Sequence, residues 1–274
     1  MILGYVCTNY NNSAYTREAV CSLLKNGGDE YRIAVVDNNS DSKNVEALKN
    51  LASEFTQVEL ILSKENVGYF RGLNLGIRHL RASQPDINIM VIGNNDLIFP
   101  ADFGESIRKN LPTLEKYAVV SPDIVTLEGV HQNPHVIHKI SKFREFIYDL
   151  YYANYFLAIA VREVAKLTRR FTERRDQTQH EIAQEIYLGL GACYVLGPAF
   201  FRHFEELWAP TFLMAEEFFL SKQLSDKGLR IYYEPSIKVL HHFQVSMGAL
   251  GHKKAWHFAR DAHKVYRQYV KVFD

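Results

Sequence analysis

The chain has 274 residues, 47% of them hydrophobic, which is long enough to bury a core as one large α/β domain or two small ones. Lys and Arg number 32 against 31 Asp and Glu, so the sequence lacks the overall positive charge that attracts nucleic acid, and no nucleic-acid partner is expected. Its three cysteines are an odd number without Cys-x-x-Cys spacing, which indicates reduced thiols in a cytoplasmic protein.

The chain shows no pattern for secretion or for a membrane span. The N-terminus lacks a basic flank, a long apolar run and a small-residue cleavage site. No stretch of about 18 apolar residues occurs elsewhere. We therefore expect a chain that is not secreted through such a signal and does not cross a membrane.

Short apolar runs alternate with amphipathic stretches through the first hundred residues. Strands are predicted over residues 2–7, 31–36, 58–62 and 87–92, and helices over residues 13–25, 44–55 and 68–82. Ser13 is the predicted N-cap of the first helix. This alternation predicts the α/β class, with a mostly parallel, doubly wound sheet.

The pattern changes in the second half. From about residue 141 it is helical and rich in Tyr, Phe, Arg and Lys, with no strand pattern until about residues 192–196. Further helices are predicted near 199–207 and 215–227, strands near 230–233 and 237–240, and a basic amphipathic helix over 253–272. We divide the chain into an α/β half, 1–125, a helical insertion, 126–191, and a second half, 192–274.

Polar clusters follow three of the predicted strands. They are residues 8–11, residues 37–41 and Asn94-Asn95-Asp96. Ligands of doubly wound sheets bind beyond the carboxyl ends of the strands, so these clusters are expected to converge on one crevice. A carboxylate held there, such as Asp96, suits a hard divalent cation that also bridges phosphate oxygens. The alternative is an Asx-rich turn before Pro100.

Several segments in chain order resemble glycosyltransferase family 2, the inverting enzymes of the A-type fold, including its rhamnosyltransferase-like branch. They are residues 8–11, 35–41, 66–76, 94–96, 212–220, 233–243 and 256–261. The resemblance covers residues 1–125 and 192–261. It implies a nucleotide-sugar-binding half followed by an acceptor and catalytic half, with the helical insertion as an acceptor or membrane-surface element.

The family carries an Asp-x-Asp motif where this chain has Asn94-Asn95-Asp96. The resemblance implies that Asp96 binds Mg²⁺ or Mn²⁺. Because Asn94 replaces the first Asp of the motif, the site has one negative charge fewer and a lower expected affinity for metal. His241, at the end of a predicted strand, is implied as a further metal or diphosphate contact. A lone histidine is more often structural, but a histidine pair directly after an apolar strand favours function.

The resemblance also implies a set of donor-binding residues: Thr8, Tyr10, Asp37, Asn66, Gly68, Arg71, Asn94, Asn95 and Arg260. Thr8 and Tyr10 are expected near the base, and Asp37 is expected to accept a hydrogen bond from a pyrimidine N3–H. A UDP- or dTDP-sugar donor follows. Asp37 is alternatively a loop-capping residue.

Three glycines, Gly68, Gly72 and Gly76, are spaced by four residues and therefore share one helix face. Without side chains they let the helix backbone approach the sheet or the donor, and close packing is the main role expected of Gly76. Arg71, between them, is a candidate contact to the donor's diphosphate or ribose.

Glu216 and Glu217 match the acidic pair that carries the catalytic base in the family. Such a base takes the proton of the acceptor hydroxyl, a contribution of about 10²–10⁴ in rate. Adjacent side chains on a helix point in different directions, so we favour Glu217 and place Glu216 second. Alternatively, both are first-turn acids that complement the helix dipole.

The helical insertion has a local positive charge. Between residues 162 and 175 there are six Lys and Arg against two Glu, beside an aromatic face over 151–157. A basic amphipathic helix is typical of a membrane-surface element, and a lipid-linked acceptor would give it a purpose. An ordinary packed helix or a homo-oligomer contact explains the pattern equally well.

Together these observations give a functional hypothesis. It is an inverting transfer of sugar to a hydroxyl of a glycan or lipid-linked acceptor, in bacterial surface polysaccharide synthesis, in the cytoplasm or on the inner membrane face. A nucleotidyltransferase is one alternative, although no Gly-rich loop bearing Arg and Lys follows the first strand. A non-catalytic sugar-nucleotide-binding protein is the other, because the Asp-x-Asp motif is incomplete.

Overall fold

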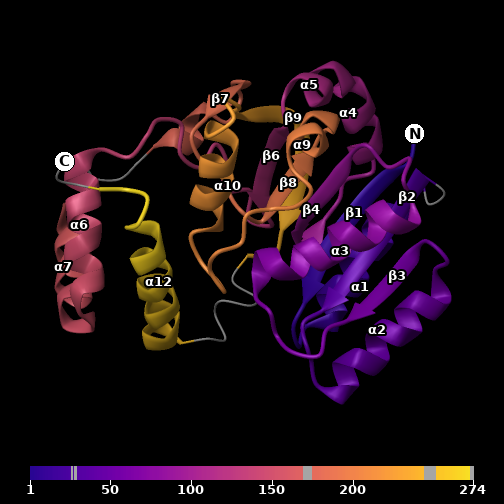
Figure 1. Cartoon of the computed structure of the whole chain (residues 1–274), viewed down its shortest axis with the longest axis horizontal. Helices are drawn as coiled ribbons and strands as arrows, with labels where there is room; N and C mark the ends of the chain where they lie inside the picture. Colours follow the sequence, from indigo (N-terminus) through magenta and orange to yellow (C-terminus); the bar gives the residue numbers. More distant parts are fainter. Residues whose placement is uncertain (26, 28–29, 169–174, 244–250, 272–274) are drawn as a thin grey trace.

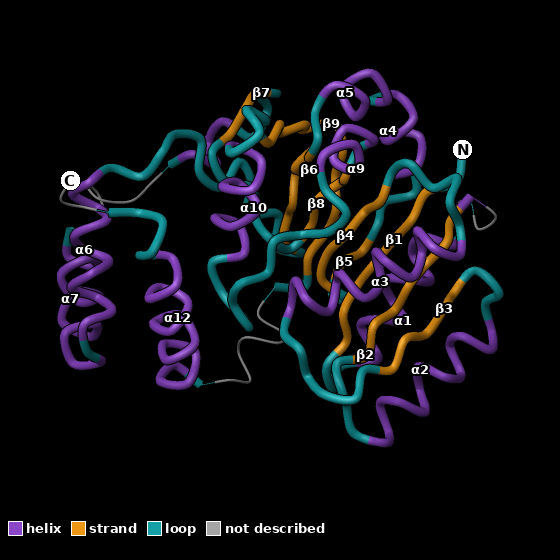
Figure 2. Tube along the Cα trace, in the orientation of Figure 1, coloured by secondary structure: helices purple, strands orange, loops and turns teal. Residues whose placement is uncertain are grey.

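The computed structural model of the chain describes residues 1–25, 27, 30–168, 175–243 and 251–271. In these residues a nine-stranded sheet forms the centre of the fold, with helices on both faces (Figures 1 and 2). The strands are β1 (Leu3–Asn9), β2 (Tyr31–Asp37), β3 (Val58–Leu62), β4 (Met90–Asn94), β5 (Leu97–Ile98), β6 (Val119–Thr126), β7 (Gln184–Ile186), β8 (Cys193–Leu196) and β9 (Ile231–His241).

The helices follow the strands in an alternating order through the first half. They are α1 (Ser13–Leu24), α2 (Ser42–Glu54), α3 (Tyr69–Ser83), α4 (Phe103–Lys109), α5 (Leu111–Lys116), α6 (Lys142–Ala153), α7 (Tyr155–Leu167), α9 (Pro198–His203), α10 (Glu216–Ser225) and α12 (His252–Tyr266), with a 3₁₀ turn, η2 (Asp176–Gln179). The strands and helices predicted in the first hundred residues are thereby confirmed.

The sheet order is β3-β2-β1-β4-β8-β6-β9-β5, with β7 paired to β9. The pairs β1–β2, β1–β4, β2–β3 and β6–β9 are parallel. Strand β8 is antiparallel to both of its neighbours, β4 and β6. Strands β6 and β9 therefore run in the same direction as β4. The α/β class is confirmed, and the second half makes the full sheet mixed.

Alternating side chains along the strands build two cores, one on each face. On β1, Tyr5 and Cys7 belong to the core covered by α1, α2 and α4, whereas Val6 belongs to the core covered by α3, α9 and α10. This is the two-residue period of a strand buried on both faces. The carboxyl ends of β1, β2, β4, β6 and β9 consequently share one edge, which is where the predicted polar clusters lie.

Some elements differ from the prediction. Residues 97–126, for which no element is predicted, form β5, α4, α5 and β6, and β7 lies in the insertion where no strand is predicted. The strands predicted at 230–233 and 237–240 are one strand, β9, because a register shift opposite Pro122 and Asp123 absorbs Pro235. Asn12, rather than Ser13, is the N-cap position of α1, and its side chain makes no capping hydrogen bond.

The helical segment predicted after residue 141 is an antiparallel hairpin of α6 and α7. Helix α12 packs on α6, between the hairpin and the sheet (Figure 1). We call α6, α7 and α12 the helical layer. Because the one sheet contains strands from all three predicted segments, the division at residues 125 and 191 stays a prediction.

The cysteines and the length of the helices can also be compared with the sequence predictions. All three cysteines are free, and Cys7 and Cys193 are buried in the core. Among the helices that the structure describes, none is both long and apolar enough to cross a bilayer.

Candidate active site

A buried amide network joins the ends of β1 and β4. The amide nitrogen of Asn95 donates to Thr16 Oγ1 at 2.7 Å and to Asn12 Oδ1 at 2.8 Å. The Thr16 hydroxyl donates to Asn9 Oδ1 at 2.9 Å, and Asn9 Nδ2 donates to Asp37 Oδ1 at 2.9 Å. Asn95, predicted to bind the donor, therefore holds the loops together, and its amide nitrogen is already engaged within the protein.

Asp37 ends β2 in the same network. It is 1% exposed, and its second oxygen, Oδ2, accepts from the Ser40 N–H at 2.9 Å. Oδ2 therefore orders the loop after β2, which is the capping role that was the alternative, and Oδ1 joins β2 to the end of β1 through Asn9. Its contact with a pyrimidine base stays a prediction. Tyr10 is 54% exposed at the same edge, where its ring is accessible to a base.

Asp96 and His241 lie together on the other side of this edge. Both are buried, and Asp96 Oδ1 is 3.3 Å from His241 Nε2. The pairing of β5 with β9 brings them together, and the His242 N–H donates to the Asp96 carbonyl oxygen at 3.0 Å. Asn94 Nδ2 is also 3.3 Å from His241 Nε2. The structure thus brings together the predicted metal residues and the first position of the motif.

The tautomer of His241 follows from its other contact. Nδ1 lies 2.8 Å from Gln132 Oε1, an amide oxygen that only accepts, so Nδ1 carries the hydrogen. In the neutral ring Nε2 then presents a lone pair, which accepts from Asn94 Nδ2. Nε2 is also 3.3 Å from Asp96 Oδ1, a buried oxygen with no hydrogen-bond partner among the described residues. A cation that binds both atoms would stabilise this contact, and so would a proton on Nε2 that makes the two side chains an ion pair.

These atoms fit a divalent cation that the donor helps to bind. No group of three or more His, Cys, Asp or Glu in the described residues could hold a metal by itself. Mg²⁺ commonly takes one or two carboxylates and completes its shell with water and substrate phosphates. One carboxylate, one imidazole and an amide therefore suit a metal that binds with the diphosphate better than a permanent structural ion.

Two of the buried oxygens that lack a hydrogen bond lie at this edge. Within the described part of the chain, the buried side-chain oxygens without a hydrogen-bond partner are Asn38 Oδ1, Asp96 Oδ1 and Asp123 Oδ2. Asn38 follows β2 and Asp96 follows β4, whereas Asp123 lies inside β6, 3.9 Å from Lys238 Nζ. Buried polar atoms are usually satisfied, so the oxygens of Asn38 and Asp96 at the carboxyl ends of their strands are consistent with a ligand-binding edge.

Gly68 controls how α3 meets the second half of the chain. Its φ is +91°, and a Cβ there would lie 2.0 Å from the Phe212 carbonyl oxygen. That oxygen accepts from the Tyr69 N–H at 3.1 Å, and Asn66 Oδ1 accepts from the Gly68 N–H at 3.0 Å. Gly68 thus permits a backbone contact with the segment before α10, and Asn66 stabilises the turn.

Gly76 has the packing role expected of it, and Gly72 packs against the same strand. A Cβ at Gly72 would lie 2.7 Å from Thr8 Cγ2, and one at Gly76 would lie 2.3 Å from Val6 Cγ1. Both glycines therefore bring α3 against β1. Thr8 is held in this packing through its methyl group.

Glu217 lies beside a glycine backbone and a partly buried tyrosine. Its Oε1 accepts from the Gly191 N–H at 3.2 Å, and a Cβ at Gly191 would lie 2.8 Å from that oxygen. The Gly191 carbonyl oxygen accepts from the Tyr69 hydroxyl at 2.8 Å. Glu217 is only partly buried, in contrast to its neighbour Glu216.

The side chain of Glu216 points in a different direction from that of Glu217, as expected for adjacent residues on a helix. It is 7% exposed, and its Oε1 accepts from the Met214 N–H at 2.9 Å. Burial, and then the charge of Glu217, raises the pKa of Glu216 to about 8. Met214 and Ala215 have φ of +77° and +65°, so two residues in the left-handed region set the start of α10 and the directions of both glutamates.

Tyr69 lies beside Glu217 through Gly191, whose carbonyl oxygen accepts from the Tyr69 hydroxyl and whose N–H donates to Glu217. Burial raises the pKa of Tyr69 well above its ordinary value, and the charges of Glu216, Cys193, Asp96 and Glu217 raise it further. Tyr69 is therefore a neutral hydroxyl near the start of α10.

The two predicted arginines make other contacts. Arg71 Nε donates to the Ala209 carbonyl oxygen at 3.1 Å, and the residue lines a cavity of about 810 Å³ between α3 and residues 204–210. Arg260 lies on α12, bonded to Asp261 and placed 5.3 Å from the centre of the Trp256 ring. The structure does not bring either guanidinium to Asp96, and their donor contacts stay predictions.

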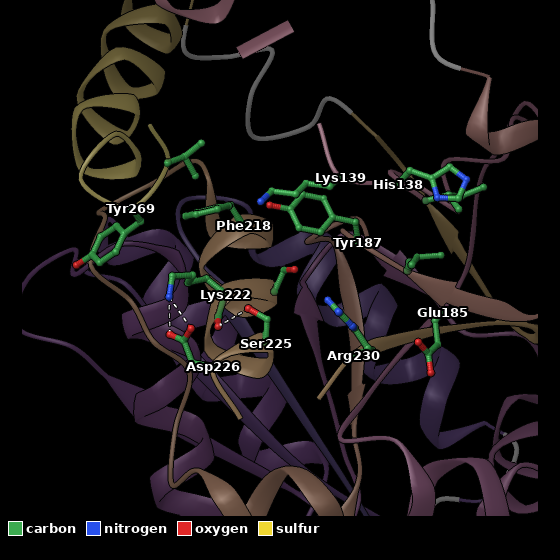
Figure 3. Close-up of a pocket in the computed structure, with 14 residues that line it drawn as sticks. His138, Lys139, Glu185, Tyr187, Phe218, Lys222, Ser225, Asp226, Arg230 and Tyr269 are labelled. Carbon is green, nitrogen blue, oxygen red and sulfur yellow. Dashed lines mark hydrogen bonds and ion pairs between the residues drawn. The ribbon is translucent and has the colours of Figure 1, made fainter. Parts of the chain in front are cut away.

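A second cavity, of about 590 Å³, lies between α10, β7 and the residues after α12 (Figure 3). Phe218 and Lys222 of α10 line it, together with Tyr187, Arg230 and Tyr269. None of the predicted site residues lines this cavity. Helix α10 therefore has two distinct faces: Glu217 on one face contacts Gly191, and Phe218 and Lys222 on the other line this cavity.

Sequence reasoning missed three residues of the site: Gln132, Tyr69 and Gly191. Gln132 and Gly191 lie in loops whose contacts depend on the pairing of distant strands. Tyr69 had a local signal, because it follows Gly68 at the start of α3. Its hydrogen bond to the Gly191 carbonyl oxygen and its partly buried position follow only from the way the distant strands pair.

The central sheet with helices on both faces is the A-type glycosyltransferase fold, and solved structures share it. The mannosyltransferase PcManGT from Pyrobaculum calidifontis, in complex with GDP-Man and Mn²⁺, matches 89% of this chain with a TM-score of 0.55 and 15% identity. The sequence model described as Glycosyl transferase family 2 matches residues 6–172. The chain belongs to that family.

Two more structures show the same likeness. GalNAc-T7 with UDP, GalNAc and Mn²⁺ matches 88% of this chain, with a TM-score of 0.56 and 10% identity. S. aureus TarS 1-349 in complex with UDP-GlcNAc also matches 88%, with a TM-score of 0.53 and 12% identity. At these identities the likeness is one of fold. No curated protein sequence matches the chain.

The chain is shorter than these structures. It spans 57% of the mannosyltransferase chain, 43% of GalNAc-T7 and 58% of the TarS chain. Each of them therefore contains regions beyond the shared fold.

Proposed function

We propose that the protein transfers a sugar from a UDP- or dTDP-sugar to an acceptor hydroxyl, with inversion at the anomeric carbon. The observation that carries the proposal is Asp96 Oδ1, a buried carboxylate oxygen that has no hydrogen-bond partner among the described residues and lies 3.3 Å from His241 Nε2. The family supports sugar transfer, and the structures that match include complexes with Mn²⁺ and with nucleotide sugars.

Asp96 and His241, with Asn94 beside them, would hold Mg²⁺ or Mn²⁺ together with the donor diphosphate. When bound, the metal supplies positive charge that stabilises the leaving diphosphate. The amide network around Asn95 holds the strand ends in place, so these ligand atoms are positioned before the donor arrives.

Glu217 is the proposed base. Its carboxylate accepts the proton of the acceptor hydroxyl while that oxygen forms a bond to the anomeric carbon and the bond to the diphosphate breaks. The Gly191 N–H fixes one carboxylate oxygen and leaves the other for the acceptor. Glu216, whose pKa is raised to about 8, is largely protonated at neutral pH and is the weaker candidate.

The finer assignments depend on the sequence. The preference for uracil or thymine rests on Asp37, and the assignment to bacterial surface polysaccharide synthesis rests on the resemblance to the rhamnosyltransferase-like branch. The proposed acceptor is a glycan or a lipid-linked sugar, used in the cytoplasm or at the inner membrane face.

The test is calorimetric titration of the chain with a panel of nucleotide sugars, with and without Mn²⁺, followed by product analysis. We expect uridine or thymidine diphosphate sugars to bind, with Mn²⁺ increasing the affinity. Synthesis of a nucleotide sugar from a nucleoside triphosphate and a sugar phosphate would instead show a nucleotidyltransferase. Unchanged transfer and donor hydrolysis in both Glu217→Gln and Asp96→Ala would contradict the site assignment.

A further inference from the structure

Asn133 is a fully buried amide at the point where three segments of the chain meet. Its side-chain nitrogen donates to Ser121 Oγ at 3.0 Å and to the Pro122 carbonyl oxygen at 2.8 Å, both in β6. Its side-chain oxygen accepts from the Leu190 N–H at 3.0 Å, in the loop between β7 and β8. Because the Pro122 carbonyl only accepts and the Leu190 N–H only donates, these contacts fix the orientation of the amide.

The residue before Asn133 belongs to the part of the proposed site that binds metal. Gln132 Oε1 lies 2.8 Å from His241 Nδ1, and His241 Nε2 lies 3.3 Å from Asp96 Oδ1. Gln132 is also held through its backbone, because its N–H donates to the Ile124 carbonyl oxygen at 2.8 Å. We call these three side chains the metal side. The metal side thus has a support that does not depend on the side chain of Asn133.

The residue after Leu190 belongs to the part of the site that carries the proposed base. The Gly191 N–H donates to Glu217 Oε1 at 3.2 Å. Backbone hydrogen bonds to residue 136 and to β4 hold the two ends of this loop, and Asn133 holds Leu190 between them. We call Gly191 and Glu217 the base side. The amide of Asn133 therefore joins the segment that carries the metal side to the loop that carries the base side.

From these contacts we propose that Asn133 is a positioning residue that fixes the base side relative to the metal side. The inference rests on the proposed function, in which the acceptor oxygen attacks as the diphosphate leaves in line with it. Both groups must then be held in place, and a displacement of about 1 Å costs about 100-fold in rate. Without the amide, the Leu190 N–H loses its partner and Glu217 loses a fixed support at Gly191. The metal side keeps its own support.

The experiment compares Asn133→Ala with Ser121→Ala. Both variants remove a buried hydrogen bond at the same place, but only Asn133→Ala removes the bond to Leu190. We expect kcat per folded molecule to fall by about 10–100-fold in Asn133→Ala, with the affinities for Mn²⁺ and UDP unchanged. Ser121→Ala should have the kcat of the unmodified chain. Equal kcat values in the two variants, whether both are lowered or neither is, would overturn the proposal.

Asn133→Asp is the conservative variant. It keeps an oxygen that accepts from the Leu190 N–H, and a buried carboxyl group without a cation favours its protonated form, which can also donate. We expect this variant to recover part of the kcat that Asn133→Ala loses. A lower kcat in Asn133→Asp than in Asn133→Ala, per folded molecule, would contradict the role of the contact with Leu190.

Amide hydrogen exchange at Leu190 tests the contact in the unmodified chain, before any variant has to fold. We expect slow exchange of the Leu190 N–H in the unmodified chain and faster exchange in Asn133→Ala. Exchange at the rate of an unbonded amide in the unmodified chain would overturn the proposal. Absence of sugar transfer by the unmodified chain would refute the proposed function itself, whereas transfer that survives Asn133→Ala unchanged would refute the role of Asn133 alone.

Discussion

Asn95 and Asp96 are neighbours in sequence but belong to two regions that differ in how their polar atoms are satisfied. The Asn95 region is closed, because its amides, Thr16 and Asp37 bond to one another. The Asp96 region is open, because Asp96 Oδ1 has no hydrogen-bond partner in the part of the chain that the structure describes and lies 3.3 Å from His241 Nε2. Closed networks hold a shape, whereas an unsatisfied buried carboxylate raises the free energy of the fold and indicates a ligand.

The same contrast separates the two glutamates of α10. Glu216 is buried against the Met214 N–H, and Glu217 is partly exposed beside Gly191. The comparison predicts that changes in the open region affect metal binding and catalysis, and that changes in the closed region affect folding.

The largest effect is expected for Glu217→Gln. Transfer should slow by about 10²–10⁴, because the amide cannot take the acceptor proton, while donor binding stays the same. The matched variant Glu216→Gln should retain most of the rate. Steady-state kinetics with the donor found by calorimetry measures both, and a greater loss in Glu216→Gln would reverse the assignment of the base.

Gln132→Leu tests how His241 is held. Without the amide acceptor at Nδ1 the imidazole loses its fixed tautomer, and we expect Mn²⁺ affinity to fall by about 10–100-fold. Gln132→Glu keeps an acceptor and should keep the affinity. Nitrogen NMR of the histidine ring in the metal-free protein should show hydrogen at Nδ1, and hydrogen at Nε2 would refute this role of Gln132.

Asn95→Ala probes the closed region. Loss of the amide leaves buried partners such as Thr16 Oγ1 unsatisfied, so the free energy of unfolding should decrease by about 1–3 kcal/mol. Urea denaturation measures this loss. Mn²⁺ affinity of the folded variant should not change, and a large loss of affinity at full stability would place Asn95 in the metal site after all.

Glu216 should make stability depend on pH. Between its ordinary value of 4.5 and its raised pKa of about 8, the folded chain holds a proton that the unfolded chain has released. The free energy of unfolding therefore falls as pH rises through this window. Relative to the unmodified chain, Glu216→Gln should gain at least about 1 kcal/mol between pH 5 and pH 9. Denaturation curves that differ equally at both pH values would contradict the raised pKa.

Much of the first half of the fold is readable from the sequence, because four apolar runs alternate with amphipathic helices. The convergence of Asp37, Asn94 and Asp96 at one edge follows from parallel strands alone. The second half is harder to read, because β7 has three residues and β9 contains Pro235 within a bulge.

Within the site, the sequence shows which polar residues lie at the strand ends but not which residues they contact. Asn95 and Asp96 carry the same local signal, and only the placement of Thr16 and His241 distinguishes the structural residue from the candidate ligand. Gln132 has no local signal, since its contact depends on the pairing of β6 with β9.

The most direct test of the open site is Mn²⁺ titration calorimetry of the unmodified chain and Asp96→Asn, each with and without UDP. The isosteric amide removes a buried charge that has no hydrogen-bond partner at Oδ1, so Asp96→Asn should be at least as stable as the unmodified chain. We predict that Mn²⁺ and UDP bind cooperatively to the unmodified chain, and that Asp96→Asn loses Mn²⁺ affinity by at least about tenfold. Equal Mn²⁺ affinity in the two proteins would contradict the assignment of Asp96 as the metal ligand.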